Sequence, residues 1–120
     1  MQTSKFRMLL DMQESVSKYE LNIKEGDQNT RGIKAVFSDG GEPYLLDSSV
    51  DHADFITTIG GDTYEAAATI SDDGSVFVMI PTFSMTAGIY ECEFHIYRQA
   101  GAAINSITSP SFRIVVNPTV

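Results

Sequence analysis

The residues of this chain that could hold a metal ion gather in one acidic loop. His52 lies within a few positions of Asp47, Asp51 and Asp54, and loop carboxylates of this kind can ligate Ca²⁺. The spacing differs from that of an EF-hand, and the two histidines of the chain are too few for a His-rich metal site. We therefore expect solvated loop acids, no metal and no cofactor, with a calcium site as the alternative.

Nucleophilic catalysis would need a Ser, Thr or Cys held by a base and by a third, orienting group. Cys92 and His95 are three positions apart, so they face opposite sides of a regular strand. Ser48 and Ser49 are close to His52 but lack a strained G-x-S-x-G elbow. The sequence therefore predicts no catalytic residue and no enzyme. A pocket that brought His52 within hydrogen-bond reach of either serine would argue otherwise.

Two glycine pairs and two tyrosines are further candidates for binding. The glycine pairs at 40–41 and 60–61 do not precede a helix or a Gly-Lys-Ser/Thr sequence, so we interpret them as hairpin turns and not as phosphate cradles. Tyr44 and Tyr97 are expected to face outward, where tyrosine can stack on a sugar or on a protein partner. Cover of an edge strand is the commoner reason for such residues.

Charge and composition narrow the class of partner. Eight scattered Lys and Arg stand against sixteen Asp and Glu, for a formal charge of −8, and no basic patch is present to neutralise a nucleic-acid backbone. The length of 120 residues is that of one domain. Cys92 is the single cysteine, which excludes a disulfide within the chain. No apolar run approaches the length of a membrane span or a signal-peptide core, so we expect synthesis in the cytoplasm and no membrane contact.

Alternation of apolar and polar residues with a period of two organises the sequence and is broken at Gly, Asp, Asn and Pro clusters. This pattern predicts an all-β domain. We expect strands at 5–12, 19–24, 33–38, 44–46, 53–59, 63–70, 75–80, 89–97 and 111–116. Turns are expected at 25–29, 39–41, 60–62 and 71–74, a polar linker at 13–18, and a small-residue loop at 99–106. A single helical turn at 82–86 is the one candidate helix.

The strand at 89–97 has the clearest alternation. Tyr90 stands two positions before Cys92, the spacing of a tyrosine corner, in which the phenol hydroxyl bonds backbone a few residues upstream. This spacing predicts a single immunoglobulin-like antiparallel β-sandwich of about seven to nine strands. The residues expected in its core are Ile23, Phe37, Val78, Tyr90, Cys92, Phe94, Ile96, Phe112 and Ile114.

From residue 19 onward the order of turns and strands resembles the N-terminal domain of the baseplate upper proteins of phages that infect Gram-positive bacteria. The segments that carry the resemblance are EGD at 25–27, FSDGGEPYLLD at 37–47, DDGSVFVMIP at 72–81, AGIYECEF at 87–94 and TSPSFRIVV at 108–116. Each segment alone is a turn and a strand of a common kind. Their order and spacing together are more specific.

The resemblance implies a structural module of a phage or prophage tail baseplate, present in the virion after assembly in the host cytoplasm. It implies docking of a receptor-binding or fibre-like protein to the tail hub, no catalysis and no cofactor. The expected partners are other tail proteins, namely the tail hub and the receptor-binding protein, together with further copies of the chain. Family members usually continue into a coiled segment and a receptor-proximal part, so we expect an excised N-terminal domain or a stand-alone relative.

Two further expectations concern organisation and an alternative function. Residues 1–18 are expected to form an N-terminal strand and polar linker packing on or beside the domain, and residues 19–120 the sandwich. Such a linker would let the first strand detach or add to the sheet edge of a neighbour.

The alternative function is a carbohydrate-binding or adhesin-type immunoglobulin-like module that uses Tyr44, Tyr97 and the loop acids.

Overall fold

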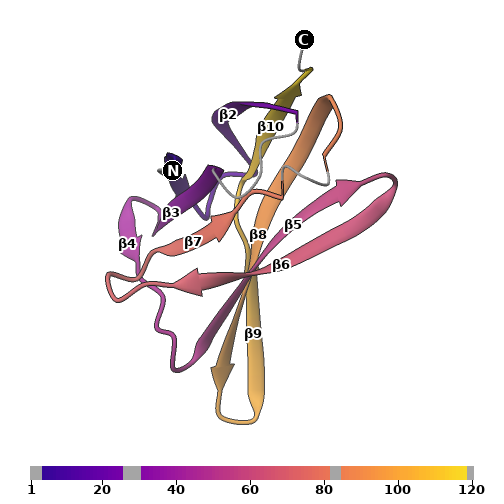
Figure 1. Ribbon diagram of the computed structural model, residues 1–120. Helices are drawn as coiled ribbons and strands as arrows, with labels where there is room; N and C mark the ends of the chain where they lie inside the picture. Colours follow the sequence, from indigo (N-terminus) through magenta and orange to yellow (C-terminus); the bar gives the residue numbers. More distant parts are fainter. Residues whose placement is uncertain (1–3, 26–30, 82–84, 119–120) are drawn as a thin grey trace.

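The computed structural model describes residues 4–25, 31–81 and 85–118, and all regular structure in them is β-strand (Figure 1). These residues form the strands β1 (Ser4–Asp11), β2 (Val16–Lys24), β3 (Arg31–Asp39), β4 (Glu42–Tyr44), β5 (Asp51–Ile59), β6 (Asp62–Ile70), β7 (Val76–Met79), β8 (Gly88–Ala100), β9 (Ala103–Thr108) and β10 (Ser111–Asn117). Most of the expected turn at 25–29 and of the helical turn at 82–86 lies outside the described residues. Within the described ranges there is no helix that could cross a membrane.

The strands form one hydrogen-bonded ladder that folds into two layers. Its order is β1-β3-β7-β6-β5-β8-β10-β2, with β4 added to β3 and β9 added to β8. β6 belongs to both layers, because its residues 62–68 pair with β5 whereas Thr69 and Ile70 pair with β7. The two ends of the ladder meet where the Leu9 amide of β1 donates to the Tyr19 hydroxyl of β2 at 3.0 Å. The domain is therefore all-β, as the sequence predicts, and nearly closed.

Two strand pairings depart from a purely antiparallel sandwich. β1 runs parallel to β3, and β2 runs parallel to β10. The other pairings of the described residues are antiparallel. Both parallel strands come from the N-terminal 24 residues and lie in different layers. The beginning of the chain therefore crosses from one layer to the other between β1 and β2.

Two segments that we expected to be irregular are strands. The expected loop at 99–106 is instead a hairpin in which Gln99 of β8 pairs with Ile104 of β9. The expected linker at 13–18 ends early, because β2 already begins at Val16. Both segments are largely exposed, so burial imposes no apolar alternation on them. The addition of β9 brings the number of strands in the described residues to ten.

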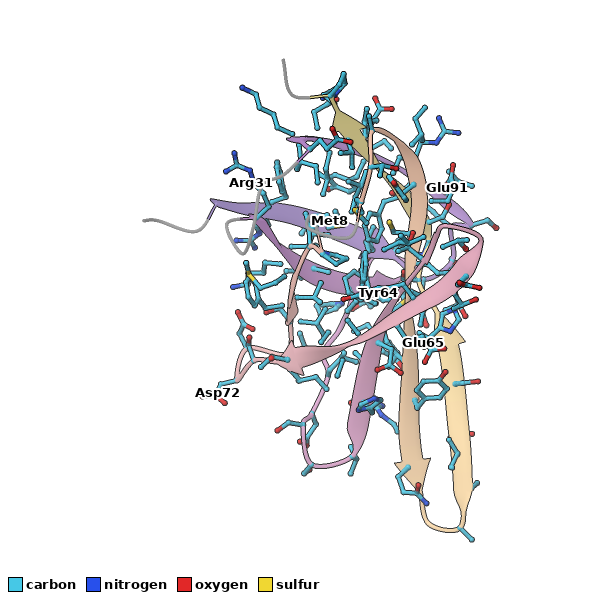
Figure 2. All side chains as sticks on the ribbon, turned by 45° about the vertical axis from the view of Figure 1, so that its right-hand side comes forward. Met8, Arg31, Tyr64, Glu65, Asp72 and Glu91 are labelled. Atoms are coloured by element: carbon cyan, nitrogen blue, oxygen red, sulfur yellow. The ribbon has the colours of Figure 1, made fainter. Side chains whose placement is uncertain are left out.

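Four phenylalanines hold the two layers together, three from the neighbouring strands β5, β8 and β10 of one layer and Phe37 from β3 of the other. The ring centroid of Phe94 in β8 lies 5.9 Å from that of Phe37 in β3, 6.0 Å from Phe55 in β5 and 5.7 Å from Phe112 in β10. Met8 lies among the strands, whereas Asp72 and Glu91 lie on the outside (Figure 2). Eight of the nine expected core residues are buried: Ile23, Phe37, Val78, Cys92, Phe94, Ile96, Phe112 and Ile114. Tyr90 differs, because it packs against this core but remains half-buried.

The two glycine pairs form hairpin turns. Gly40 and Gly41 have φ of 62° and 88°, and Gly60 and Gly61 have φ of 62° and 86°. Two consecutive residues at positive φ make the turn that matches the twist of paired strands, and only glycine adopts this conformation without strain. The pairs connect β3 to β4 and β5 to β6, which confirms the interpretation as hairpins.

Candidate functional site

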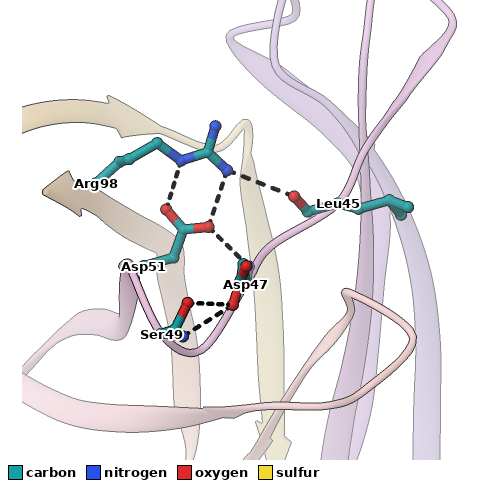
Figure 3. Close-up of polar contacts among 5 residues, drawn as sticks. All are labelled: Leu45, Asp47, Ser49, Asp51 and Arg98. Carbon is teal, nitrogen blue, oxygen red and sulfur yellow. Dashed lines mark hydrogen bonds and ion pairs between the residues drawn. The ribbon is translucent and has the colours of Figure 1, made fainter. Parts of the chain in front are cut away.

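The polar residues singled out in the sequence gather where β5 begins and β8 approaches its end (Figure 3). Asp51, the first residue of β5, pairs in register with Arg98 of β8. Arg98 Nε donates to Asp51 Oδ1 at 2.7 Å, and Arg98 Nη2 donates to Oδ2 at 2.9 Å. The Asp51 side chain is 0 % exposed and that of Arg98 is 39 % exposed. The guanidinium therefore both neutralises and covers a buried carboxylate.

The loop before β5 is fastened to the same carboxylate. The Asp47 amide donates to Asp51 Oδ2 at 2.8 Å, and the Ser49 amide and hydroxyl donate to Asp47 Oδ1 at 2.9 Å and 2.8 Å. Arg98 Nη2 also donates to the Leu45 carbonyl at 3.5 Å. We name Leu45, Asp47, Ser49, Asp51 and Arg98 the β5–β8 clamp. It holds the β4–β5 connection against the end of β8.

Hydrogen bonding keeps the clamp charged. The Arg98 side chain lowers the pKa of Asp51, although burial of the carboxyl opposes this shift. The Ser49 amide and hydroxyl lower the pKa of Asp47. The bond to Asp51 in turn raises the pKa of Arg98. At neutral pH the three groups are ionised and paired within the protein.

The clamp competes with the calcium alternative for its ligands. Both Asp51 oxygens already accept hydrogen bonds from Arg98 and from the Asp47 amide. Asp54 is directed to His52, whose Nε2 lies 2.8 Å from Asp54 Oδ1. Among the described residues, no three His, Cys, Asp or Glu side chains converge as metal ligands would. Calcium would have to displace the guanidinium from Asp51.

The hydrogen bonds that nucleophilic catalysis would require between His52 and a serine are not among those of the described residues. Ser49 Oγ donates to Asp47, and His52 Nε2 is paired with Asp54. Ser48 is exposed and lines an open groove instead. Neither serine is held by His52 through a described hydrogen bond.

Cys92 and His95 lie on opposite faces of β8, as the sequence predicts. Cys92 is buried, and its burial raises the pKa of the thiol to about 12, so the thiolate is not populated at neutral pH. His95 faces outward, where its Nε2 lies 3.0 Å from Glu93 Oε1. Cys92 therefore packs in the core, whereas His95 pairs with Glu93 at the surface.

Tyr44 and Tyr97 lie close to the clamp, and each ring is already in contact with a neighbour. The Arg98 Cζ atom lies 5.6 Å from the Tyr44 ring centroid. The ring centroid of His52 lies 6.4 Å from that of Tyr97, at an interplanar angle of 30°. Both tyrosines are half-buried. A stacked sugar would have to compete with these contacts for the ring faces.

The tyrosine corner is present. The Tyr90 hydroxyl donates to the Thr86 carbonyl at 2.7 Å, four residues upstream. Cys92, two positions further on, pairs in register with Phe112 of β10. The corner thus ties the chain that enters β8 to the start of the strand without a disulfide, because Cys92 is a free thiol.

Asp11, a functional side chain that the sequence did not single out, closes the end of β1. Its carboxylate accepts the amides of Gln13, Gly40 and Gly41 at 3.0, 3.1 and 2.9 Å, and the Ser38 hydroxyl at 3.0 Å. The amides of Gln13, Gly41 and Gly40 lower the pKa of Asp11 to about 2. The positive-φ turn at 40–41 was visible in the sequence. The carboxylate that binds its amides was not, because 29 residues separate Asp11 from Gly40.

An open groove of about 520 Å³ runs between the β4–β5 connection and the β6–β7 turn. Asp47, Asp72 and Asp73 lie along it. The Asp73 carboxylate is already bound within the chain. It accepts the Ser75 amide of its own turn at 3.0 Å, and Lys34 Nζ of β3 lies 3.0 Å away. The groove is thus bordered by residues that stabilise the two connections.

Comparisons with known proteins give a likeness in structure. No family model matches the chain, and no curated protein matches it significantly. A solved structure described as the N-terminal domain of phage TP901-1 ORF48 superposes with a TM-score of 0.74. The likeness covers 94 % of this chain and 98 % of that one, at 16 % sequence identity. The chain therefore has the fold of this phage domain over nearly its whole length.

Proposed function

We propose that this chain is a structural docking module of a phage or prophage tail baseplate, which joins a receptor-binding or fibre-like protein to the tail hub. The observation that carries the proposal is the match of nearly the whole chain to the N-terminal domain of a phage protein. The resemblance of five sequence segments to baseplate upper proteins leads independently to the same class. A shared fold alone does not assign function, so the agreement of the two arguments matters.

The chemistry of the surface is consistent with docking. In the β5–β8 clamp, Asp51 and Arg98 are paired with each other within the chain. Cys92 is buried and protonated. What the described part of the chain presents to a partner is sheet surface and open strand edges, the features by which β domains assemble.

The carbohydrate-binding alternative has weaker support. It depends on Tyr44 and Tyr97, whose rings already contact Arg98 and His52. A glycan array tests it directly, with Tyr97→Ala as the matched variant. A sugar signal that disappears in this variant would favour the alternative over docking.

The docking proposal is tested in particles and with purified proteins. The chain carrying an epitope tag is expected in purified virions, with gold-labelled antibody at the distal end of the tail by electron microscopy. It is also expected to co-elute with the tail-hub protein of the same phage in size-exclusion chromatography. The proposal would be refuted by a folded, tagged chain that is absent from intact virions and does not co-elute with the hub protein.

A further inference from the structure

β9 has an open edge. It pairs with β8 on one side, and no other strand of the described residues pairs with it. Five of its six residues are exposed, and Ile104 is 67 % exposed. Figure 1 shows β9 and the end of β8 projecting below the rest of the sheet, where approach is unobstructed by other strands. An edge of this kind presents backbone donors and acceptors to another chain.

The backbone pattern shows which groups point away from β8. The Ser109 amide donates to the Phe94 carbonyl at 2.9 Å, and the Phe94 amide donates to Ser109 Oγ at 2.9 Å. Hydrogen-bonded pairs recur at every second residue of an antiparallel ladder, so Ile107 and Asn105 also bond toward β8 in the observed register. The amides and carbonyls of Ile104, Ser106 and Thr108 are therefore directed outward.

Charge distinguishes this edge from the others. Residues 99–112 contain no ionisable side chain, although the chain carries a formal charge of −8. The other strands with a single partner all carry a carboxylate: Asp11 in β1, Glu20 in β2 and Glu42 in β4. Two copies of an acidic chain repel each other least where both surfaces are uncharged. The edge of β9 is therefore the one best suited to a second copy.

We propose that two copies of this chain pair their β9 strands antiparallel about a twofold axis through Ser106. Centring on Ser106 sets Ile104 of each copy opposite Thr108 of the other, so all three outward residues bond and about six backbone hydrogen bonds form. The interface is isologous and uses the β9 edge of each copy, so pairing through β9 stops at the dimer. This inference is independent of the proposed baseplate role, because it rests on the strand edge alone.

Disulfide trapping tests the register. In a hydrogen-bonded antiparallel pair the facing Cα atoms lie about 5.5 Å apart, within disulfide range. Ser106→Cys should therefore give a covalent dimer under mild oxidation, while the native Cys92 is buried and does not interfere. Asn105→Cys is the matched control, because position 105 faces position 107 of the other copy and should cross-link poorly. Equal cross-linking of the two variants would overturn the register.

Sedimentation of the 120-residue chain over a concentration series tests the dimer itself. A monomer–dimer equilibrium is expected. Ser106→Pro removes an outward amide without touching the bonds to β8. Because both copies carry the substitution, the twofold pair loses two equivalent hydrogen bonds, and dimerisation should weaken at least about tenfold. Ser106→Ala keeps the backbone and should dimerise like the native chain. A native chain that stays monomeric at every concentration, or a Ser106→Pro variant that is folded and dimerises as tightly, would refute the proposal.

Discussion

At the scale of single residues, the polar side chains of this domain act on their own backbone and on one another. Asp11 gathers three amides around the end of β1, Asp51 holds the β4–β5 connection, and Tyr90 fixes the entry to β8. Asp73 does the same for the β6–β7 turn. These polar side chains thus stabilise the connections between strands.

Tyr90→Phe should lower the free energy of unfolding by about 1 kcal/mol, the usual net value of one hydrogen bond. The ring stays, and the hydroxyl loses its 2.7 Å bond to the Thr86 carbonyl together with a long 3.5 Å contact to Thr86 Oγ1. Tyr97→Phe is the matched control, because no described hydrogen bond uses the Tyr97 hydroxyl, and it should be nearly neutral. Urea denaturation measures both, and an unchanged midpoint for Tyr90→Phe would contradict the structural role of the corner.

Arg98→Met should destabilise the domain by about 3 kcal/mol, because it leaves the buried Asp51 carboxylate without its cation. Arg113→Met is the control. Arg113 pairs with Glu91 at 2.8 Å, but the two side chains are 55 % and 57 % exposed, so its loss should cost less than about 1 kcal/mol. Similar costs for the two variants would show that the β5–β8 clamp behaves as an ordinary surface pair.

The lowered pKa values of Asp11 and Asp51 predict acid sensitivity. A carboxyl whose pKa is lower in the folded state stabilises the fold above its unfolded pKa of about 3.9, and this contribution is lost as pH falls toward the folded value. For Asp11 that window extends from about pH 4 to about 2. Asp11→Asn should therefore melt lower at pH 7 but lose less stability on acidification.

Asp72→Asn serves as the control for this measurement, because Asp72 lies at an exposed turn and makes no described hydrogen bond. Its melting temperature should follow that of the native chain from pH 7 to pH 2. If Asp11→Asn and Asp72→Asn show the same acid profile as the native chain, the Asp11 amide contacts do not contribute to stability.

At the scale of elements, the connections limit substitution more than the exposed strand surfaces do. The β6–β7 turn contains Gly74 at φ 84°, and a Cβ atom there would lie 2.7 Å from the Leu45 Cβ. The Gly74 carbonyl also accepts the Leu46 amide at 3.0 Å. This turn is therefore packed directly against the β4–β5 connection, and both connections are positioned together.

Gly74→Ala should destabilise the domain by about 2 to 3 kcal/mol, from backbone strain plus the steric clash with Leu45. Gly101→Ala separates the two causes. Gly101, in the β8–β9 turn, also has positive φ, at 62°, but a Cβ atom added there would meet nothing within 4 Å, so only about 1 kcal/mol of strain is expected. Thermal denaturation of the two variants gives the comparison, and equal losses would rule out the clash.

At the scale of the whole molecule, β1 completes a nearly closed ladder. It pairs with β3 over its full length and contributes Met8 and Leu10 to the core. The Leu9 amide reaches β2, and Asp11 holds the β3–β4 turn. The division into residues 1–18 and 19–120 remains a proposal, and the contacts of β1 make it testable.

Deleting residues 1–14 should abolish the cooperative thermal transition. Loss of two buried side chains costs about 2 to 5 kcal/mol each, which is comparable to the total stability of a domain of this size. Leu9→Ala in the full chain is the control, because Leu9 is exposed and its truncation should be nearly neutral. If the shortened chain melts within a few degrees of the full one, β1 is an accessory strand that can leave the domain.

The sequence by itself determined the fold class, the faces of most strands, the hairpin turns at 40–41 and 60–61, and the corner at Tyr90. These features are local: a period of two indicates which side chains are buried, and glycine pairs indicate where the chain reverses. Exposed strands could not be predicted in this way. β9 and the start of β2 bury few side chains, so their sequences show no apolar alternation.

The tertiary structure alone decided which strands are neighbours, and with that the parallel pairings of β1 and β2, the contact of Asp11 with a turn 29 residues away, and the pairing of Asp51 with Arg98. The same holds for the open, uncharged edge of β9. The physical reason is that alternation specifies the face of a strand and not its partner, since any strand of matching face can form the same backbone hydrogen bonds. Only the packing of the whole core selects among those pairings.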